Sequence, residues 1–299
     1  MQLQILGPLE ILDVDGVPIF VSGQKRRALL AALVVRAGRT LSMDRLIEEL
    51  WGGTPPANAT NALQAHIGRL RKAVEAACGE PDRIVTRPPG YCLTLRPDET
   101  DAAAFAAKVA AARSVAPAAA IPLLRAALAL WRGPALDGCV VGEICAAEAV
   151  GLDESKLTAL EALYDASLRV GRHAEVVGEL EESTAAHPLR ERFYDQLMVA
   201  LCRSDRRSDA LSVYERARRR LITELGVEPG PTLRARERSI RSNGVVELDP
   251  PKSSVASVSA ETEELSREVA ELQQRIETLA SRQEALLLKL AGDRPVAAG

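Results

Sequence analysis

The chain has 299 residues, 47% of them hydrophobic and 26% charged, which is typical of a globular protein and excludes a wholly disordered one. No apolar run approaches the ~18 residues of a membrane span and the first residues lack the pattern of a secretion signal, so we expect a cytoplasmic protein with no membrane partner. The formal net charge is −3, yet residues 1–96 hold 12 Lys and Arg against 9 Asp and Glu, which places the basic excess at the N-terminal end.

The cysteines, histidines and glycines of the chain do not form the patterns that are typical of enzyme active sites. The five cysteines are odd in number and form no Cys-x-x-Cys pair, which argues against a disulfide framework and a structural zinc site. The three histidines, His66, His173 and His187, stand in separate helical contexts, and no glycine-rich phosphate-binding motif is present. We therefore predict no catalytic residue, no metal ligand and no cofactor.

Residues 1–56 predict a small sheet followed by two helices. The segment MQLQILGPLEILDVDGVPIFV alternates apolar and polar residues and contains Gly-Pro and Asp-Gly turns, a pattern typical of short antiparallel strands. A helical period over 24–36 ends at Gly38, and Ser42 is in position to cap a second short helix. The residues GGTPP at 52–56 cannot continue that helix, so a loop follows.

The segment NALQAHIGRLRKAV, residues 61–74, predicts an amphipathic third helix. Leu63, Ile67, Leu70 and Val74 form one apolar stripe, while the outer face carries Asn61, Ala65, Gly68, Arg69 and Lys72, flanked by Gln64 and Arg71. Ala65 and Gly68 put almost no side chain where a solvated helix usually carries Lys or Glu, which favours close contact with a polyanion. His66 lies on a flank near the stripe, so we expect a structural histidine whose polar atoms are satisfied. A basic surface helix with two small residues is the alternative.

Residues 84–95 predict a β-hairpin whose turn contains Arg87, Pro88, Pro89 and Gly90. Strands, three helices and a hairpin, in this order, form a winged helix in which the third helix enters the major groove and the hairpin tip reaches the backbone or the minor groove. We therefore predict base contacts by Asn61, Gln64 and Arg69, close approach at Ala65 and Gly68, phosphate contacts by Arg71 and Lys72, and a backbone or minor-groove contact by Arg87.

From residue 101 onward the sequence predicts only helices. The Ala-rich segments AAAFAAKVAAARS and AAIPLLRAALALWRG have a helical period, and a further helical region begins at Gly151. Two segments, LYDASLRVGRHAEVV and LMVALCRSDRRSDAL, align at an offset of 34 residues, which pairs Leu163 with Leu197 and Gly171 with Asp205. This offset is the tetratricopeptide period, in which helix pairs stack to bury a face that neither buries alone.

The last part of the chain changes pattern twice. Residues 243–260 are rich in Pro and Ser, as linkers are, and residues 261–292 carry a heptad repeat. Its a and d positions are Leu265, Val269, Leu272, Ile276, Leu279, Gln283, Leu286 and Leu290. Leucine at d with β-branched residues at two a positions favours a parallel coiled coil and therefore a homodimer. A helix that folds back on its own domain is the alternative.

Six motifs together span about residues 1–240: LGPLEI, QKRRALLAAL, DRLIEELWGGTPPANATNALQAHIGRLRKAV, IVTRPPGYCLTL, AALALWRGPAL and the segment from HPLRERFY to GPTLR. They resemble the motifs of the AfsR/SARP family of actinobacterial antibiotic-pathway regulators. The resemblance implies an OmpR-type winged helix followed by a bacterial transcriptional activation domain. It also implies binding to directly repeated DNA sites upstream of biosynthetic promoters and recruitment of the RNA polymerase holoenzyme through its sigma factor.

The resemblance also implies a surface for polymerase. In OmpR-type domains the loop between the second and third helices faces polymerase, and the corresponding loop here is 51–58. Its candidate contact residues are Trp51, Gly52, Gly53, Thr54 and Asn58. An ordinary connection rich in Pro and Gly is the alternative interpretation of this loop.

The predicted fold class is an α+β winged helix-turn-helix domain, an all-α tetratricopeptide-like domain and a C-terminal coiled-coil helix. The predicted boundaries are 1–97 for the DNA-binding domain, 98–242 for the activation domain, 243–260 for the linker and 261–292 for the coiled coil. The predicted function is sequence-specific activation of an antibiotic or other secondary-metabolite gene cluster. A scaffold or ligand-sensing adaptor that dimerises without binding DNA is the rival hypothesis, but it leaves Ala65 and Gly68 unexplained.

Overall fold

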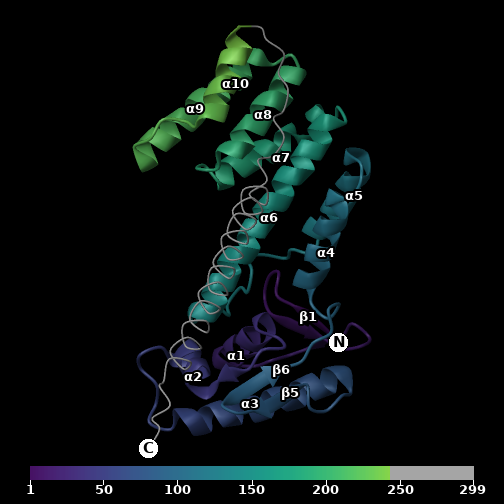
Figure 1. The fold of residues 1–299 in the computed structure, drawn as a ribbon, viewed down its shortest axis with the longest axis vertical. Coiled ribbons are helices and arrows are strands. Elements are labelled where there is room, and N and C mark those ends of the chain that lie inside the picture. The colour runs from purple at the N-terminus through teal and green to yellow at the C-terminus, as the bar shows by residue number, and fades with distance from the viewer. Residues whose placement is uncertain (243–299) are drawn as a thin grey trace, which may run out of the picture. The chain divides into compact units, whose positions relative to one another are not determined.

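The structure is a computed structural model of the chain, and it describes residues 1–242 (Figure 1). A winged-helix region at the N-terminus is followed by a region made of helices, as the sequence predicts. The predicted linker 243–260 and the predicted coiled coil 261–292 lie outside the described residues. Within residues 1–242, no helix has both the length and the apolar character that crossing a membrane requires.

Three short strands form the N-terminal antiparallel sheet: β1 (Gln2–Gln4), β2 (Glu10–Leu12) and β3 (Pro18–Ile19), in the order β1-β2-β3. Asp13 closes the turn between β2 and β3, because its carboxylate accepts hydrogen bonds from the N–H groups of Asp15 and Val17, both at 2.8 Å. Gly16 has a φ of 80° in this turn, a conformation that glycine adopts without strain.

Three helices enclose the winged-helix core: α1 (Gln24–Val35), α2 (Met43–Trp51) and α3 (Ala59–Cys78). The predicted cap of α2 is confirmed, since Ser42 Oγ accepts a hydrogen bond from the N–H of Arg45 at 3.3 Å. α3 is longer than the predicted helix at both ends. It continues until Gly79, which adopts a left-handed conformation with φ 68° and ends the helix.

The second sheet forms the wing, with β4 (Leu41–Ser42), β5 (Ile84–Arg87) and β6 (Gly90–Leu93) in the order β4-β6-β5. The sequence pattern does not predict β4, because two residues are too few to show alternation. Gly90 allows β4 and β6 to approach each other, since a Cβ at this position would lie 1.8 Å from the carbonyl oxygen of Leu41. The hairpin is therefore held against the start of α2.

Seven helices follow the wing in the described chain: α4 (Asp101–Arg113), α5 (Pro117–Leu128), α6 (Glu143–Arg169), α7 (His173–Ala186), α8 (Glu191–Arg203), α9 (Arg207–Leu225) and α10 (Pro231–Arg241). The predicted start of the third of these at Gly151 was wrong, because α6 already begins at Glu143. The residues before Gly151 are rich in Ala, a strong helix former, and Gly151 itself is exposed inside the helix.

The turns α6–α7 and α8–α9 repeat each other at an offset of 34 residues. α6 and α8 end at Arg169 and Arg203, and α7 and α9 begin at equally offset positions. The aligned residues Gly171 and Asp205 both have positive φ, 81° and 58°. The N–H of the next residue in each turn donates to a carbonyl five residues earlier, at 2.9 Å in both cases. The predicted alignment therefore matches two turns of the same geometry.

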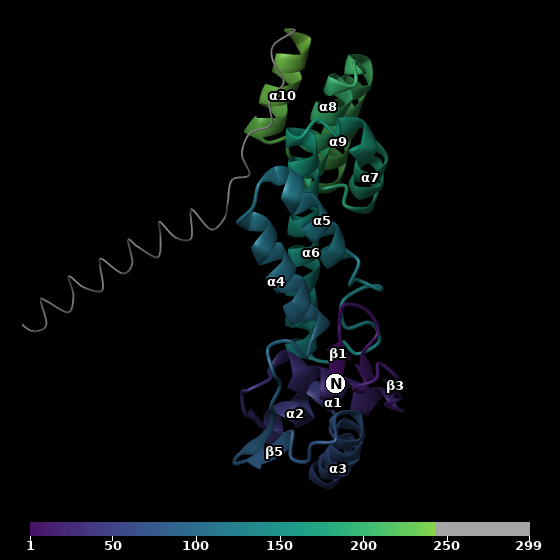
Figure 2. The same cartoon turned by 90° about the vertical axis from the view of Figure 1, so that its right-hand side faces the viewer.

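The winged-helix region and the helical region share one buried joint. Cys139, Ile144 and Cys145 of the helical region belong to the same buried cluster as the leucines of α1 and α2. Asp101, at the start of α4, accepts hydrogen bonds from the N–H groups of Ile5 and Leu6 at 2.8 and 3.0 Å. Figure 2 shows one end of α6 against the winged helix, next to α1.

Candidate nucleic-acid interface

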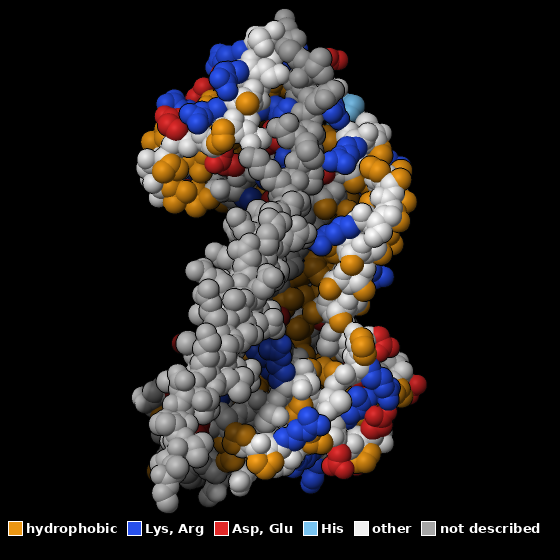
Figure 3. All heavy atoms as spheres, in the orientation of Figure 1, with side chains coloured by type: hydrophobic (Ala, Val, Ile, Leu, Met, Phe, Trp, Pro, Cys, Tyr) orange, Lys and Arg blue, Asp and Glu red, His pale blue; other side chains and the backbone are white. Residues whose placement is uncertain are grey.

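α3 has a buried face and a fully exposed one. The predicted stripe Leu63, Ile67, Leu70 and Val74 is at most 1% exposed and packs in the winged-helix core. Six of the predicted DNA-binding residues, Asn61, Gln64, Ala65, Gly68, Arg69 and Lys72, are all exposed on the other side of the helix. Figure 3 shows Lys and Arg side chains over the area where Figure 1 places α3. The structure thus brings these six residues together on one helix.

The packing of the protein does not require glycine at position 68. A Cβ added to Gly68 would meet no atom of the described chain within 4 Å, and its φ is not positive. Glycine inside a helix costs about 1 kcal/mol relative to alanine, so the chain is less stable with this residue than it needs to be. Ala65 is exposed one turn earlier. These two small residues form a flat area on the helix that suits an external surface in close contact.

The exposed face of α3 also carries uncompensated positive charge. Arg69 and Lys72 form neither a hydrogen bond nor an ion pair with any residue of the described chain, 1–242. By contrast, Arg190 in the helical region is paired with Glu154 and Glu161. Cations that remain unpaired beside a flat area are available to phosphate groups.

Arg71 has a different environment from its neighbours on α3. Its Nε donates to the carbonyl oxygen of Ile84 and its Nη2 to Thr86 Oγ1, both at 2.8 Å. The guanidinium also lies over the ring of Tyr91, 5.9 Å from its centroid. Residue 71 lies on the flank of α3 that faces the wing, so the structure joins its side chain to β5. Arg71 therefore also has a positioning role between α3 and the wing, and its contact with phosphate stays a prediction.

Arg87 is exposed at the end of β5, next to the tip of the wing. It pairs with Gly90 across the hairpin, so that only Pro88 and Pro89 form the turn. The carbonyl of Pro89 accepts a hydrogen bond from the N–H of Met43 at 3.1 Å, which ties the tip to α2. Arg87 is thus presented to solvent beside a hairpin tip that is tied to α2, and its contact with DNA stays a prediction.

The loop between α2 and α3 begins one residue later than predicted. Trp51 is the last residue of α2, and its half-buried ring stacks on His66 with centroids 6.3 Å apart and with Lys25 Nζ 5.8 Å from its centroid. Trp51 is therefore an anchor of the loop, because its apolar ring packs inward. Gly52 is half-buried, whereas Gly53, Thr54 and Asn58 are exposed and available to a partner.

The surroundings of His66 favour the neutral form of its imidazole. Its Nδ1 is buried without a hydrogen-bond partner among the described residues. Burial lowers the pKa of His66 below its ordinary value of 6.5, and the nearby charges of Arg26, Arg69 and Lys25 lower this pKa further. His66 stacks on Trp51, which fits the predicted structural role, but the prediction that its polar atoms are satisfied was wrong for Nδ1, because this atom is buried with no acceptor or donor of the described chain within reach.

The lowered pKa of His66 predicts a loss of stability in acid. The unfolded chain takes up the proton first, so stability is complete above about pH 6.5 and falls as the pH drops toward the lower pKa of the folded state. We expect the free energy of unfolding in urea to fall less between pH 7.5 and 5.5 for His66→Gln than for the unchanged protein. An identical pH dependence in the two proteins would refute the role of His66.

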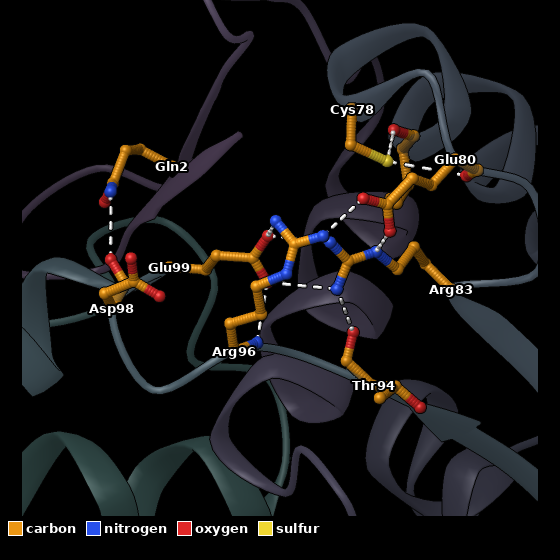
Figure 4. A network of polar contacts seen from close by, with 9 residues as sticks. Gln2, Cys78, Glu80, Arg83, Thr94, Arg96, Asp98 and Glu99 are labelled. Carbon is orange, nitrogen blue, oxygen red and sulfur yellow. Dashed lines mark hydrogen bonds and ion pairs between the residues drawn. The ribbon is translucent and has the colours of Figure 1, made fainter.

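A buried ion network at the base of the wing is a feature that the sequence analysis missed (Figure 4). Arg83, before β5, donates two hydrogen bonds to the Glu99 carboxylate at 2.8 and 3.1 Å and a third to the carbonyl of Thr94 at 3.2 Å. Glu99 also accepts from the N–H of Arg96 at 2.7 Å. Glu80, after α3, pairs with Arg83 at 2.9 Å. The network joins the end of α3, the wing and the segment leading to α4.

Two family models match the chain. The bacterial transcriptional activator domain matches residues 100–241, and the C-terminal domain of transcriptional regulatory proteins matches residues 21–93. The second match contains α3 and the wing. The first match contains all the helices from α4 to α10.

The chain is also similar to individual proteins. It is 42% identical to the transcriptional regulator RedD of Streptomyces coelicolor, over 80% of this chain and 70% of RedD. It is 36% identical to the regulatory protein DnrI of Streptomyces peucetius, over 80% of this chain and 92% of DnrI. The structure of Mycobacterium tuberculosis EmbR, solved with a low-affinity phosphopeptide, matches 89% of this chain and 70% of the EmbR chain with a TM-score of 0.78 and 36% identity. The present chain spans 62% of the full EmbR sequence.

Proposed function

Because the chain belongs to the SARP family of transcriptional regulators, we propose that it is a transcriptional activator that binds directly repeated DNA sites through α3 and the wing. Asn61, Gln64 and Arg69 read base edges, Lys72 contacts phosphate, and Arg87 reaches the minor groove or the backbone. The observation that carries this proposal is the exposed flat area of Ala65 and Gly68 beside the unpaired cations Arg69 and Lys72, because packing within the described chain does not require these small residues.

The proposal extends to the helical region. A DNA-binding domain over 1–97 is followed by a tetratricopeptide-like activation domain over 98–242, and the equal turns α6–α7 and α8–α9 support this assignment. The activator recruits the RNA polymerase holoenzyme through its sigma factor at the promoters of an antibiotic or other secondary-metabolite gene cluster. Gly53, Thr54 and Asn58, exposed in the loop between α2 and α3, are the proposed polymerase contacts.

A salt-titrated binding assay tests the proposal. The full chain is titrated against duplexes tiled from the promoters beside its own gene, at several salt concentrations. We expect one preferred, directly repeated site and a steep fall of affinity with salt, because phosphate contacts release counterions. Weak binding of equal strength to every duplex would remove DNA binding from the proposal and favour the scaffold hypothesis.

Single substitutions sort the contacts of α3 in the same assay. Gln64→Ala and Arg69→Ala should each weaken binding to the preferred site by about 1–3 kcal/mol and relax its sequence preference. Lys72→Ala should weaken binding to all duplexes alike and lower the salt slope by about one unit. The same response from all three variants would show that base and phosphate contacts have been assigned wrongly.

The rival scaffold hypothesis and the activator hypothesis both predict a homodimer through 261–292. Removal of residues 261–299 should change the sedimenting species from a dimer to a monomer, because this removes every a and d position of the heptad repeat. In the dimer, the second DNA-binding domain is tethered close to the second of two repeated DNA sites, which raises its local concentration. The truncated monomer lacks this tether, so its binding to two repeated sites should be weaker. An unchanged mass would exclude the coiled coil as the dimer contact.

A further inference from the structure

Glu49 joins the winged helix to the helical region through a buried carboxylate. The residue lies in α2 and is 3% exposed. One carboxylate oxygen accepts from the N–H of Ile144 at 2.7 Å and the other from the N–H of Cys145 at 3.0 Å. These two N–H groups belong to the first turn of α6, where helical N–H groups lack partners within the helix and a negative charge is stabilising. A side chain of α2 therefore caps a helix of the other region.

The fit at this joint is close. A Cβ on Gly142, directly before α6, would lie 2.5 Å from both the backbone carbonyl oxygen and Oε2 of Glu49. Any larger residue at 142 would push α6 away from α2. A second contact crosses the joint between Arg36, directly after α1, and Glu148 of α6, which lie 3.2 Å apart with about a third of each side chain exposed. The direction of α6 is therefore set by α2 at one point and by α1 at another.

The same end of α2 also sets the position of the exposed loop. Only Leu50 and Trp51 separate Glu49 from the loop. The carbonyl of Leu50 accepts a hydrogen bond from Lys25 Nζ, and Trp51 is stacked on His66. Movement of Glu49 relative to α6 must therefore move the start of the loop relative to the helical region.

We infer that Glu49 is a positioning residue that holds the loop between α2 and α3 in a defined place relative to the activation domain, so that both meet polymerase together. This inference rests on the proposed function. The outer face of α3 takes no part in the joint, because its side chains point to solvent. Loss of the carboxylate should therefore impair activation while DNA binding is retained.

The test compares Glu49→Gln with Glu48→Gln in the full chain. Glutamine keeps the size of Glu49 but turns an NH2 group toward one of the two backbone N–H groups, so one of the two capping hydrogen bonds and the negative charge at the start of α6 are lost. Glu48 is the exposed neighbour in α2 and its side chain has no partner in the described chain, which makes it a matched control. Three quantities are measured: the melting temperature, the dissociation constant for the preferred duplex, and the run-off transcript made by the cognate polymerase holoenzyme at saturating protein.

For Glu49→Gln we expect a dissociation constant within about twofold of the unchanged protein and a transcript yield about tenfold lower, as for a residue that couples two sites. Glu48→Gln should change neither. Normal transcript yield from folded Glu49→Gln, or a parallel loss of DNA binding, would overturn the inference. If the unchanged protein itself shows no preferred site or no activation, the proposed function fails instead.

A second variant keeps the test decisive if Glu49→Gln does not fold. Glu148→Gln removes the partly exposed pair with Arg36 at the same joint and leaves the buried cap intact. It should fold, bind the duplex normally and lower the transcript yield about threefold. An unchanged yield from Glu148→Gln, with Glu49→Gln unfolded, would leave Glu49 with a role in stability alone and overturn the inference.

Discussion

Gly68→Glu should abolish binding to the preferred DNA site while the protein stays folded. The new side chain adds bulk and negative charge at the flat area of α3, which the proposed function places closest to the DNA, and we expect affinity to fall by a factor on the order of 100 or more. The fold tolerates the change, because a Cβ at this position meets no described atom within 4 Å. Thermal melting and duplex titration of the same sample measure both effects.

Gly178→Glu is the matched control for this prediction. Gly178 is also an exposed glycine inside a helix, α7, and a Cβ there likewise meets no described atom within 4 Å. Gly68→Glu should gain up to about 1 kcal/mol of stability from the better helix former, and Gly178→Glu should gain less, because Glu175 and Glu182 lie three and four residues away on the same helix. Only Gly68→Glu should lose DNA binding. Normal affinity for Gly68→Glu would remove α3 from the groove, and the helix would then have to be considered an ordinary basic surface helix.

Arg83→Met should have the largest effect on stability, lowering the free energy of unfolding by about 3–5 kcal/mol, the usual range when one partner of a buried ion pair is removed. The side chain of Arg83 is 8% exposed and that of Glu99 is 5% exposed. Without Arg83, the buried Glu99 carboxylate loses both of its hydrogen bonds from the guanidinium. Urea unfolding followed by circular dichroism measures the change.

Arg96→Gln tests whether the stability loss expected for Arg83→Met comes from the burial of its ion pair. Arg96 also pairs with Glu80, but its side chain is 59% exposed. An exposed pair contributes about 0–1 kcal/mol, so this variant should unfold almost like the unchanged protein. If Arg83→Met lowered the free energy of unfolding as little as Arg96→Gln does, the buried ion network would not hold the wing against α3 and the segment before α4.

The features predicted correctly from the sequence are local in the chain. The buried stripe of α3 follows from the helical period, and the cap at Ser42 follows from a hydroxyl three residues before the N–H that it binds. The aligned turns at Gly171 and Asp205 follow from a repeat of fixed length. Each of these depends on spacing along a few turns of one element, which the residue pattern records directly.

Only the tertiary structure determines which charged side chains are exposed to solvent and which form hydrogen bonds with other parts of the chain. Arg69 and Arg71 are both arginines on the polar side of one helix, yet Arg71 is held by β5 and Arg69 is exposed. Glu49 caps a helix that begins 94 residues later, and its neighbour Glu48 stays in solvent. The chain offers many arginines and glutamates of equal chemistry, so their pairing depends on where packing of the apolar core places the backbone, and no spacing along the sequence encodes it.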